Sequence, residues 1–117
     1  MPRLVILETP YRGDNNYANL EKNIEFARAC MRDCFINHNE SPFVSHLLYT
    51  QEGILNDNDP NERALGIKAG LAWGSLAEAT VVYTDKGISK GMKIGIQRAE
   101  EVGRPVEYRT LKFSLLP

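Results

Sequence analysis

Two hydrophobic periodicities divide this chain into alternating strands and helices. The segments 3–8 and 80–84 are near-continuous apolar runs, which are typical of strands covered on both faces of a parallel sheet. Shorter strands are predicted at 42–45 and 106–109. Apolar residues at helical spacing predict helices at 17–37, 60–76 and 89–103, with a short helix at 51–55. This alternation predicts one doubly wound α/β domain over residues 1–117, with a parallel sheet of four to five strands and helices on both faces.

The helix at 60–76 carries the strongest local signal in the sequence. Asp59 is a good N-cap, Pro60 suits the first helical position, and Glu62 is placed to complete a capping box. Three glycines recur at every fourth residue of this helix, at Gly66, Gly70 and Gly74. We expect this flat stripe to pack closely against the sheet or another helix, and we expect Trp73, Tyr17 and Phe26 to be packing residues as well.

Length, composition and charge narrow the range of functions. A chain of 117 residues has room for one core, and 43% apolar and 25% charged residues are ordinary for a globular protein. The net charge of −1 argues against binding of long nucleic acid, which needs clustered Lys and Arg. No apolar run approaches the ~20 residues of a membrane span.

Cys30 and Cys34 are expected to be reduced, buried thiols of a cytoplasmic protein. With only two histidines, neither a metal site nor a cofactor is expected.

The carboxyl ends of the predicted strands define one edge of the sheet, where ligands bind in such folds. Three segments meet there: 9–16, 45–48 and 84–92. In the first segment Tyr11 could stack on a base or sugar, and Arg12 could hold a phosphate or carboxylate. Gly13 lets backbone amides approach a ligand, and Thr9 and Pro10 complete the loop. The alternative is an ordinary strand-to-helix loop with a solvated arginine.

The other two segments supply the remaining candidates. His46 could donate a hydrogen bond to a ligand or titrate near neutral pH, although a lone histidine is more often structural. The turn that opens the last predicted helix offers an anion or sugar-hydroxyl site, and its candidate residues are Asp85, Gly87, Ser89, Gly91 and Met92. The alternative for this turn is a capped helix start, with Ser89 merely as the N-cap.

Four short motifs carry a family resemblance. They are Thr9-Pro10-Tyr11-Arg12-Gly13, Ser45-His46-Leu47-Leu48, Asp57-Asn58-Asp59-Pro60 and Ile88-Ser89-Lys90-Gly91-Met92-Lys93. Together they resemble the nucleoside 2-deoxyribosyltransferase-like superfamily, and within it the small uncharacterised members common in bacteriophages and prophages. The resemblance covers nearly the whole chain. It implies a flavodoxin-like domain that recognises nucleosides or nucleotides, homodimers or larger assemblies, and cleavage or transfer of the N-glycosidic bond by a glutamate nucleophile on the last helix.

Gly95 stands at the position where the resemblance implies that glutamate. A glycine cannot attack a sugar, so Asp85 is the best surviving carboxylate on the edge, while Glu8 and Glu100 could serve only with a shifted geometry. The first function that follows is binding of a nucleotide or nucleotide-derived signal without turnover, for example as a phage sponge against host defence in the host cytoplasm. The alternative is an N-glycosidase or deoxyribosyltransferase that uses a different carboxylate. A structural module with a vestigial pocket is the third reading.

A homo-oligomer is also expected. The C-terminal tail is apolar at Phe113, Leu115 and Leu116, and such a tail is expected to pack on its own domain or on a partner subunit. Together with the glycine-striped helix at 60–76, it offers more packing surface than a small monomer easily buries.

Overall fold

The structure, a computed structural model, describes residues 1–11 and 17–111 of the chain. Its strands are β1 (Arg3–Glu8), β2 (Glu40–Phe43), β3 (Ala79–Tyr83) and β4 (Val106–Arg109). Its helices are α1 (Tyr17–His38), α2 (Ser45–Leu48), α3 (Pro60–Gly74) and α4 (Lys90–Glu101). The predicted α/β alternation is confirmed. Among these residues no helix is both long enough and apolar enough to cross a membrane.

The four strands form one sheet in the order β2-β1-β3-β4, and every neighbouring pair is parallel. β1 therefore lies at the centre, with Val5 paired to Pro42 of β2 on one side and to Ala79 of β3 on the other. The chain leaves β1 toward β2 and later returns to β3 on the other side of β1. The strand order thus reverses between β1 and β3, which is where such sheets open a crevice at their carboxyl edge.

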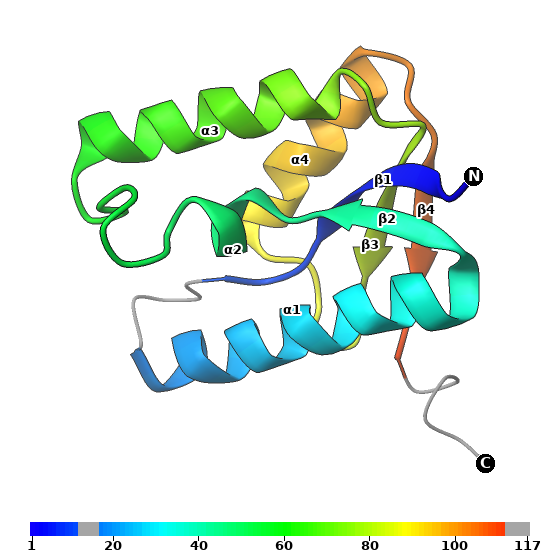
Figure 1. The fold of residues 1–117 in the computed structure, drawn as a ribbon, viewed down its shortest axis with the longest axis horizontal. Coiled ribbons are helices and arrows are strands. Elements are labelled where there is room, and N and C mark those ends of the chain that lie inside the picture. The colour runs from blue at the N-terminus through cyan, green and yellow to red at the C-terminus, as the bar shows by residue number, and fades with distance from the viewer. Residues whose placement is uncertain (12–16, 112–117) are drawn as a thin grey trace.

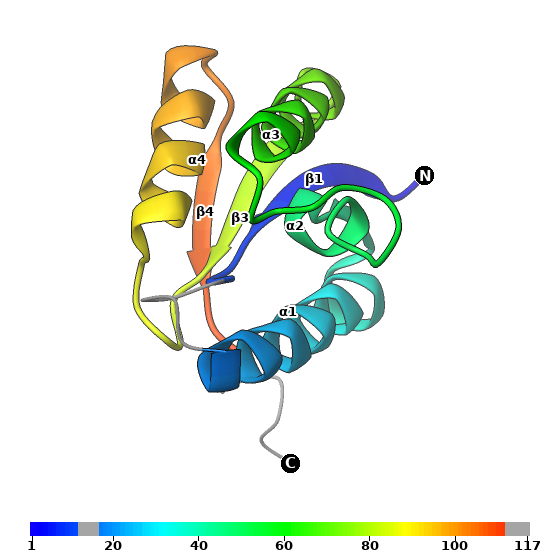
Figure 2. The same cartoon turned by 90° about the vertical axis from the view of Figure 1, so that its left-hand side faces the viewer.

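Helices cover both faces of the sheet, with α1 on one face and α3 and α4 on the other (Figures 1 and 2). Alternate residues of each strand face opposite layers. On the α1 side, Val5, Leu7 and Val81 form a core cluster with Cys30 and Cys34 of the helix. On the other side, Val82 packs with Met92 and Ile96 of α4 in a second cluster. The predicted buried thiols are confirmed, since both cysteines are free and fully buried, and burial raises the pKa of each.

The segment after α1 differs from the prediction. β2 begins at Glu40 rather than at 42, and the short helix is α2 at 45–48 rather than a helix at 51–55. The sequence did not predict that β2 begins at Glu40, because a glutamate side chain is rarely buried unless it has partners. Here Glu40 is only 2% exposed, and it accepts hydrogen bonds from Arg3 and from both terminal nitrogens of Arg109 at 2.8 and 3.0 Å.

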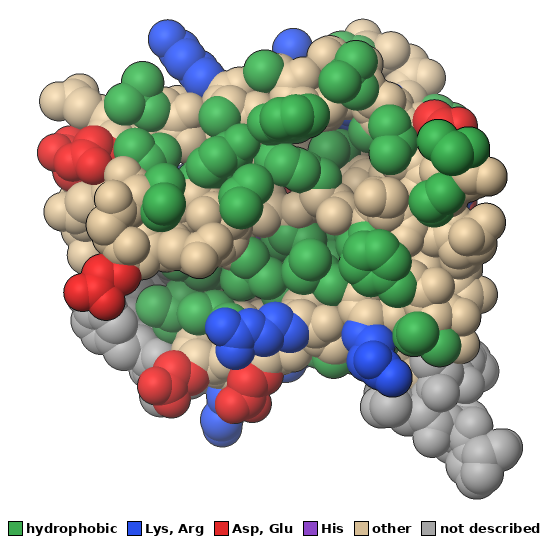
Figure 3. All heavy atoms as spheres, viewed as in Figure 1, with side chains coloured by type: hydrophobic (Ala, Val, Ile, Leu, Met, Phe, Trp, Pro, Cys, Tyr) green, Lys and Arg blue, Asp and Glu red, His purple; other side chains and the backbone are tan. Residues whose placement is uncertain are grey.

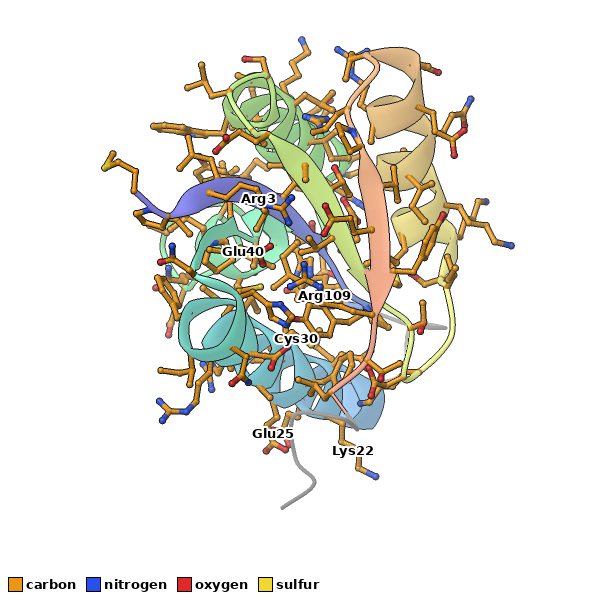
Figure 4. All side chains as sticks on the ribbon, turned by 90° about the vertical axis from the view of Figure 1, so that its right-hand side faces the viewer. Arg3, Lys22, Glu25, Cys30, Glu40 and Arg109 are labelled. Carbon is orange, nitrogen blue, oxygen red and sulfur yellow. The ribbon has the colours of Figure 1, made fainter. Side chains whose placement is uncertain are left out.

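These charges come from three different strands and tie the sheet together across the α1 side (Figure 4). Arg3 also donates to Glu107 at 2.7 and 2.9 Å. Burial alone would raise the pKa of Glu40, but the hydrogen bonds from Arg109 and Arg3 outweigh it, so the pKa lies below its ordinary value. A buried carboxylate held by two arginines is costly to break, and this accounts for a strand that begins on a charged residue.

The start of α3 follows the prediction in part. Asp59 is the N-cap and accepts a hydrogen bond from the amide of Asn61, with Pro60 at the first position. The predicted capping box is wrong. The Glu62 carboxylate instead accepts a hydrogen bond from the amide of Asn56 and fastens the preceding loop.

The glycine stripe of α3 packs closely within the domain, as predicted. A Cβ on Gly70 would lie 3.0 Å from Ser45 at the start of α2, and a Cβ on Gly74 would lie 3.6 Å from the Ile6 side chain of β1. Trp73 was expected to be a packing residue, but it is 54% exposed, with its ring centroid 5.8 Å from that of Phe43. Phe26 does pack against the α1-side core.

Candidate functional site

The carboxyl ends of β1, β2 and β3 lie at one edge of the sheet, because the three strands are parallel. The three predicted segments come directly after these strands. Their described residues therefore begin at this edge. Arg12 and Gly13 lie outside the described residues, so their part in the site remains a sequence prediction.

Thr9, Tyr11 and His46 form a compact polar and aromatic contact at this edge. The Thr9 hydroxyl lies 3.1 Å from Nε2 of His46, and the ring of Tyr11 stacks on the imidazole with centroids 4.7 Å apart. Burial lowers the pKa of His46 to about 4, so the imidazole is neutral at physiological pH. Its Nδ1 is buried and has no hydrogen-bond partner among the described residues. Pro10 between the two loop residues is buried.

An open groove of about 500 Å³ begins at Tyr11. Its other wall is the loop between α2 and α3, and its lining residues include Leu20, Thr50, Gln51, Ile54, Asn56 and Glu62. Thr50 links the two features, because its hydroxyl donates to the backbone carbonyl of His46. This volume lies within the range of small-molecule sites, and the lining mixes apolar and amide side chains with three acidic ones, Glu52, Asp57 and Glu62.

The turn after β3 is built mainly for structure. Ser89 is the N-cap of α4 and accepts from the amide of Met92, while the Met92 sulfur accepts from the amide of Ser89. Met92 is 1% exposed and belongs to the core. Gly87 has a positive φ of 82°, which this turn requires, and Gly91 faces open space.

Asp85 accepts hydrogen bonds at 3.1 and 3.0 Å from the amide of Leu111, one with each carboxylate oxygen. Its carboxylate therefore fastens the chain after β4. This arrangement weakens Asp85 as the reactive carboxylate.

The carboxyl group of Glu8 lies against Gly95 of α4. Glu8 is the last residue of β1 and points toward α4, where a Cβ added to Gly95 would lie 2.2 Å from Glu8 Oε2 and 2.4 Å from its Cδ. The glycine thus leaves the room that the Glu8 carboxyl occupies. Glu8 is partly buried, and no hydrogen-bond partner is found for its carboxyl in the described parts of the chain.

Burial raises the pKa of Glu8 to about 8, and the positive charge of Arg104 offsets only a part of this effect. Arg104 itself is occupied, since it donates to the Thr80 hydroxyl at 3.1 Å and to the carbonyl of Gly74. At neutral pH the Glu8 carboxyl is therefore mostly protonated and can both donate and accept a hydrogen bond. Among the described residues no group of three or more His, Cys, Asp or Glu side chains could hold a metal ion.

The sequence did contain a signal for this pair. Leu4, Ile6 and Glu8 share one face of β1, so a glutamate ends a face that is otherwise apolar. On α4, position 95 lies between the buried Met92 and Ala99 at helical spacing, so its side chain would also face the sheet. Read together, the two patterns bring a buried carboxyl and a glycine to one place.

The fold defines a small parallel α/β protein of the Rossmann-like class, in which the strand order reverses between β1 and β3. The chain belongs to the family described as Domain of unknown function (DUF7768), whose sequence model matches residues 3–109. No curated protein and no solved structure gives a match.

Proposed function

We propose that this protein binds a nucleotide or a nucleotide-derived small molecule at the carboxyl edge of its sheet. The observation that carries this proposal is the Tyr11 ring, which stacks on the neutral His46 and lines a groove of about 500 Å³. An aromatic face beside an open groove suits a nucleobase, because stacking contributes about 1–3 kcal/mol per base. The resemblance to the nucleoside 2-deoxyribosyltransferase-like superfamily supports the same ligand class.

The state of Glu8 favours binding without turnover. A carboxyl with a pKa of about 8 carries little negative charge at pH 7, so it neither repels a phosphate nor attacks a sugar as an anion. Position 95, where the resemblance implies the nucleophile, holds no side chain. A protein that holds a nucleotide signal without consuming it acts as a sponge, and in a phage-infected cell such a sponge would act against host defence.

The first experiment identifies the ligand and locates its site. Small molecules that co-purify with the protein are released by heat and identified by mass spectrometry, and a panel of nucleosides and nucleotides is titrated by calorimetry. Tyr11→Ala should weaken binding at least tenfold, because the stacking face is lost. Tyr108→Ala, an exposed tyrosine on β4, is the matched control and should bind normally. Equal affinity in both variants would refute the site.

Arg12 is tested in the same titrations. Loss of a charge-assisted hydrogen bond to a phosphate should cost about 1.5–3 kcal/mol, so Arg12→Ala should weaken binding of the nucleotide at least tenfold. The corresponding nucleoside, which lacks the phosphate, should bind both proteins alike. Arg28→Ala, on the exposed surface of α1, controls for the loss of one positive charge.

A second candidate function rests on the Glu8–Gly95 contact. A protonated carboxyl beside the position of the expected nucleophile could act as a general acid in N-glycosidic hydrolysis, giving its proton to the leaving base while water supplies the hydroxyl group of the sugar. Glu8, rather than Asp85, is then the acting carboxyl. Chromatography of free base after incubation with nucleosides and nucleotides, deoxy forms included, separates the two functions. Binding alone gives no free base, whereas hydrolysis gives base that Glu8→Gln abolishes.

A further inference from the structure

A second cavity lies at the amino edge of the sheet, opposite the edge that carries the groove at Tyr11. It has a volume of about 340 Å³ and lies where α3 and α4 end and where β3 and β4 begin. Part of its wall is apolar, and Arg98 and Arg104 bring positive charge to it. This volume lies within the range of small-molecule sites.

The two arginines set this cavity apart from the surface beside it. Hydrophobic side chains gather over α3 and continue toward β2 in the space-filling view (Figure 3). At the end of α3, Arg104 is partly buried, and its pKa is lowered first by burial and then by the positive charge of Arg98. Two like charges beside one cavity favour a bound anion, because the anion offsets their repulsion.

The hydrogen bonds of Arg104 leave a donor available for a ligand. Its Nε donates to the Thr80 hydroxyl at 3.1 Å, and its Nη1 donates to the carbonyl of Gly74. Its Nη2 has no hydrogen-bond partner in the described parts of the chain. The carbonyls of Gly74 and Ala99, near the ends of the two helices, accept from the backbone amides of Ala77 and Arg104. The free polar groups are therefore donors, which suit an anion.

The acids near the cavity already have other partners. Glu78, the one acid among the described residues of the lining, accepts a hydrogen bond from the amide of Leu4 at 2.8 Å. Glu101 lies 3.7 Å from a terminal nitrogen of Arg98, but both side chains are about half exposed, so solvent weakens this ion pair. Neither acid therefore neutralises the partly buried Arg104.

We propose that this cavity binds a small organic anion, with its oxyanion group on Arg104 and Arg98 and its apolar body against Leu71, Val102 and Pro105. Arginine suits phosphate and carboxylate groups alike, because its planar guanidinium donates two parallel hydrogen bonds to either. The cavity lies at the opposite edge of the sheet from the proposed nucleotide site. The inference therefore does not rest on that function.

An NMR titration of the natural, ¹⁵N-labelled protein tests the site. Phenyl phosphate carries both the anionic group and the apolar body, whereas inorganic phosphate and benzyl alcohol carry one each. The amide signals of Ala77 and Gly103, two residues of the lining, should shift with phenyl phosphate and saturate with a Kd of about 1 mM or below. Inorganic phosphate should bind at least about threefold more weakly, and benzyl alcohol should give no shift.

Two results of this titration would overturn the proposal. In one, the signals of Ala77 and Gly103 fail to saturate with phenyl phosphate by about 10 mM. In the other, inorganic phosphate binds as tightly as phenyl phosphate, so that the apolar wall contributes nothing.

Substitutions assign the shifts to this cavity. Arg104→Gln should weaken binding of phenyl phosphate at least tenfold, because a charge-assisted hydrogen bond is lost. Arg98→Gln, at the exposed side, should weaken it about threefold. Arg28→Gln, on the exposed surface of α1, is the matched control for the loss of one positive charge and should bind normally. Arg12→Ala alters the proposed nucleotide site and should leave these shifts unchanged.

Circular dichroism shows which variants are folded. Unchanged affinity in either folded cavity variant, or loss of the shifts in Arg12→Ala, would overturn the proposal. If Arg104→Gln does not fold, Arg98→Gln and the titration of the natural protein still decide.

Discussion

The carboxyl group of Glu8 occupies the space in which a side chain at Gly95 would begin. A Cβ on Gly95 would lie 2.2 Å from Glu8 Oε2, well inside van der Waals contact. The two residues are 87 positions apart and come from β1 and α4, so the fold alone brings them together. The absence of a side chain at Gly95 leaves room for the Glu8 carboxyl group, and no backbone strain at this position demands glycine.

Gly95→Ala should therefore destabilise the protein by about 1–3 kcal/mol, because the methyl group forces the Glu8 carboxyl or the helix to move. Gly91→Ala is the matched control on the same helix, since its Cβ meets nothing within 4 Å. There, the higher helix propensity of alanine should leave stability unchanged or raise it by up to about 1 kcal/mol. Urea unfolding measures both changes. Equal effects of the two substitutions would show that Glu8 yields without cost.

The ionisation of Glu8 should make stability fall as the pH rises. Its pKa is raised from 4.5 to about 8 in the folded protein, so between these values the folded state holds a proton that the unfolded state has lost. The free energy of unfolding should decrease over this range by up to about 1.4 kcal/mol per pH unit from this group. Glu8→Gln removes this contribution, so the difference between the two proteins should change from pH 5 to pH 8. Parallel stability curves, or a carboxyl carbon of Glu8 that titrates near pH 4.5 by NMR, would contradict the prediction.

The fold was largely predictable from the sequence, while the site was predictable only in part. β1 and β4 fall at the predicted residues because each is an extended run bounded by turn residues, and α4 ends before Gly103 as expected. β2 was misplaced because its first residue, Glu40, owes its burial to arginines 37 and 69 positions away. No local pattern contains that information.

The site shows the same division between local and long-range causes. The contact of Thr9 with His46 follows from two parallel strands ending at one edge, which the sequence did predict. The sequence also suggested Ser89 as a cap, and it is one. What escaped was the contact between Glu8 and Gly95, since the sequence marks each residue separately and only the packing of α4 on β1 brings them together.

His46 should remain neutral to unusually low pH. Burial lowers its pKa from 6.5 to about 4, so the folded state binds fewer protons than the unfolded state between these values. Its contribution to stability is complete above pH 6.5 and is lost as the pH falls toward 4. NMR titration of the imidazole carbons should give a midpoint near 4, and His46→Gln should flatten the acid limb of the stability curve. A midpoint near 6.5 would mean that water reaches the ring and that the stack with Tyr11 is loose.

A carboxyl moved from the strand to the helix provides the last test. Gly95→Glu alone should destabilise the protein more than Gly95→Ala, because a larger and charged side chain meets the Glu8 carboxyl. Adding Glu8→Ala empties that space, so the double variant should recover much of the lost stability. In a double-mutant cycle the coupling between the two positions should exceed 1 kcal/mol, whereas additive effects would show that the side chains do not meet.

The same double variant carries a glutamate where the resemblance implies a nucleophile. Free base released by it, and not by the natural protein, would show that a nucleoside binds beside position 95 in the orientation that such chemistry requires.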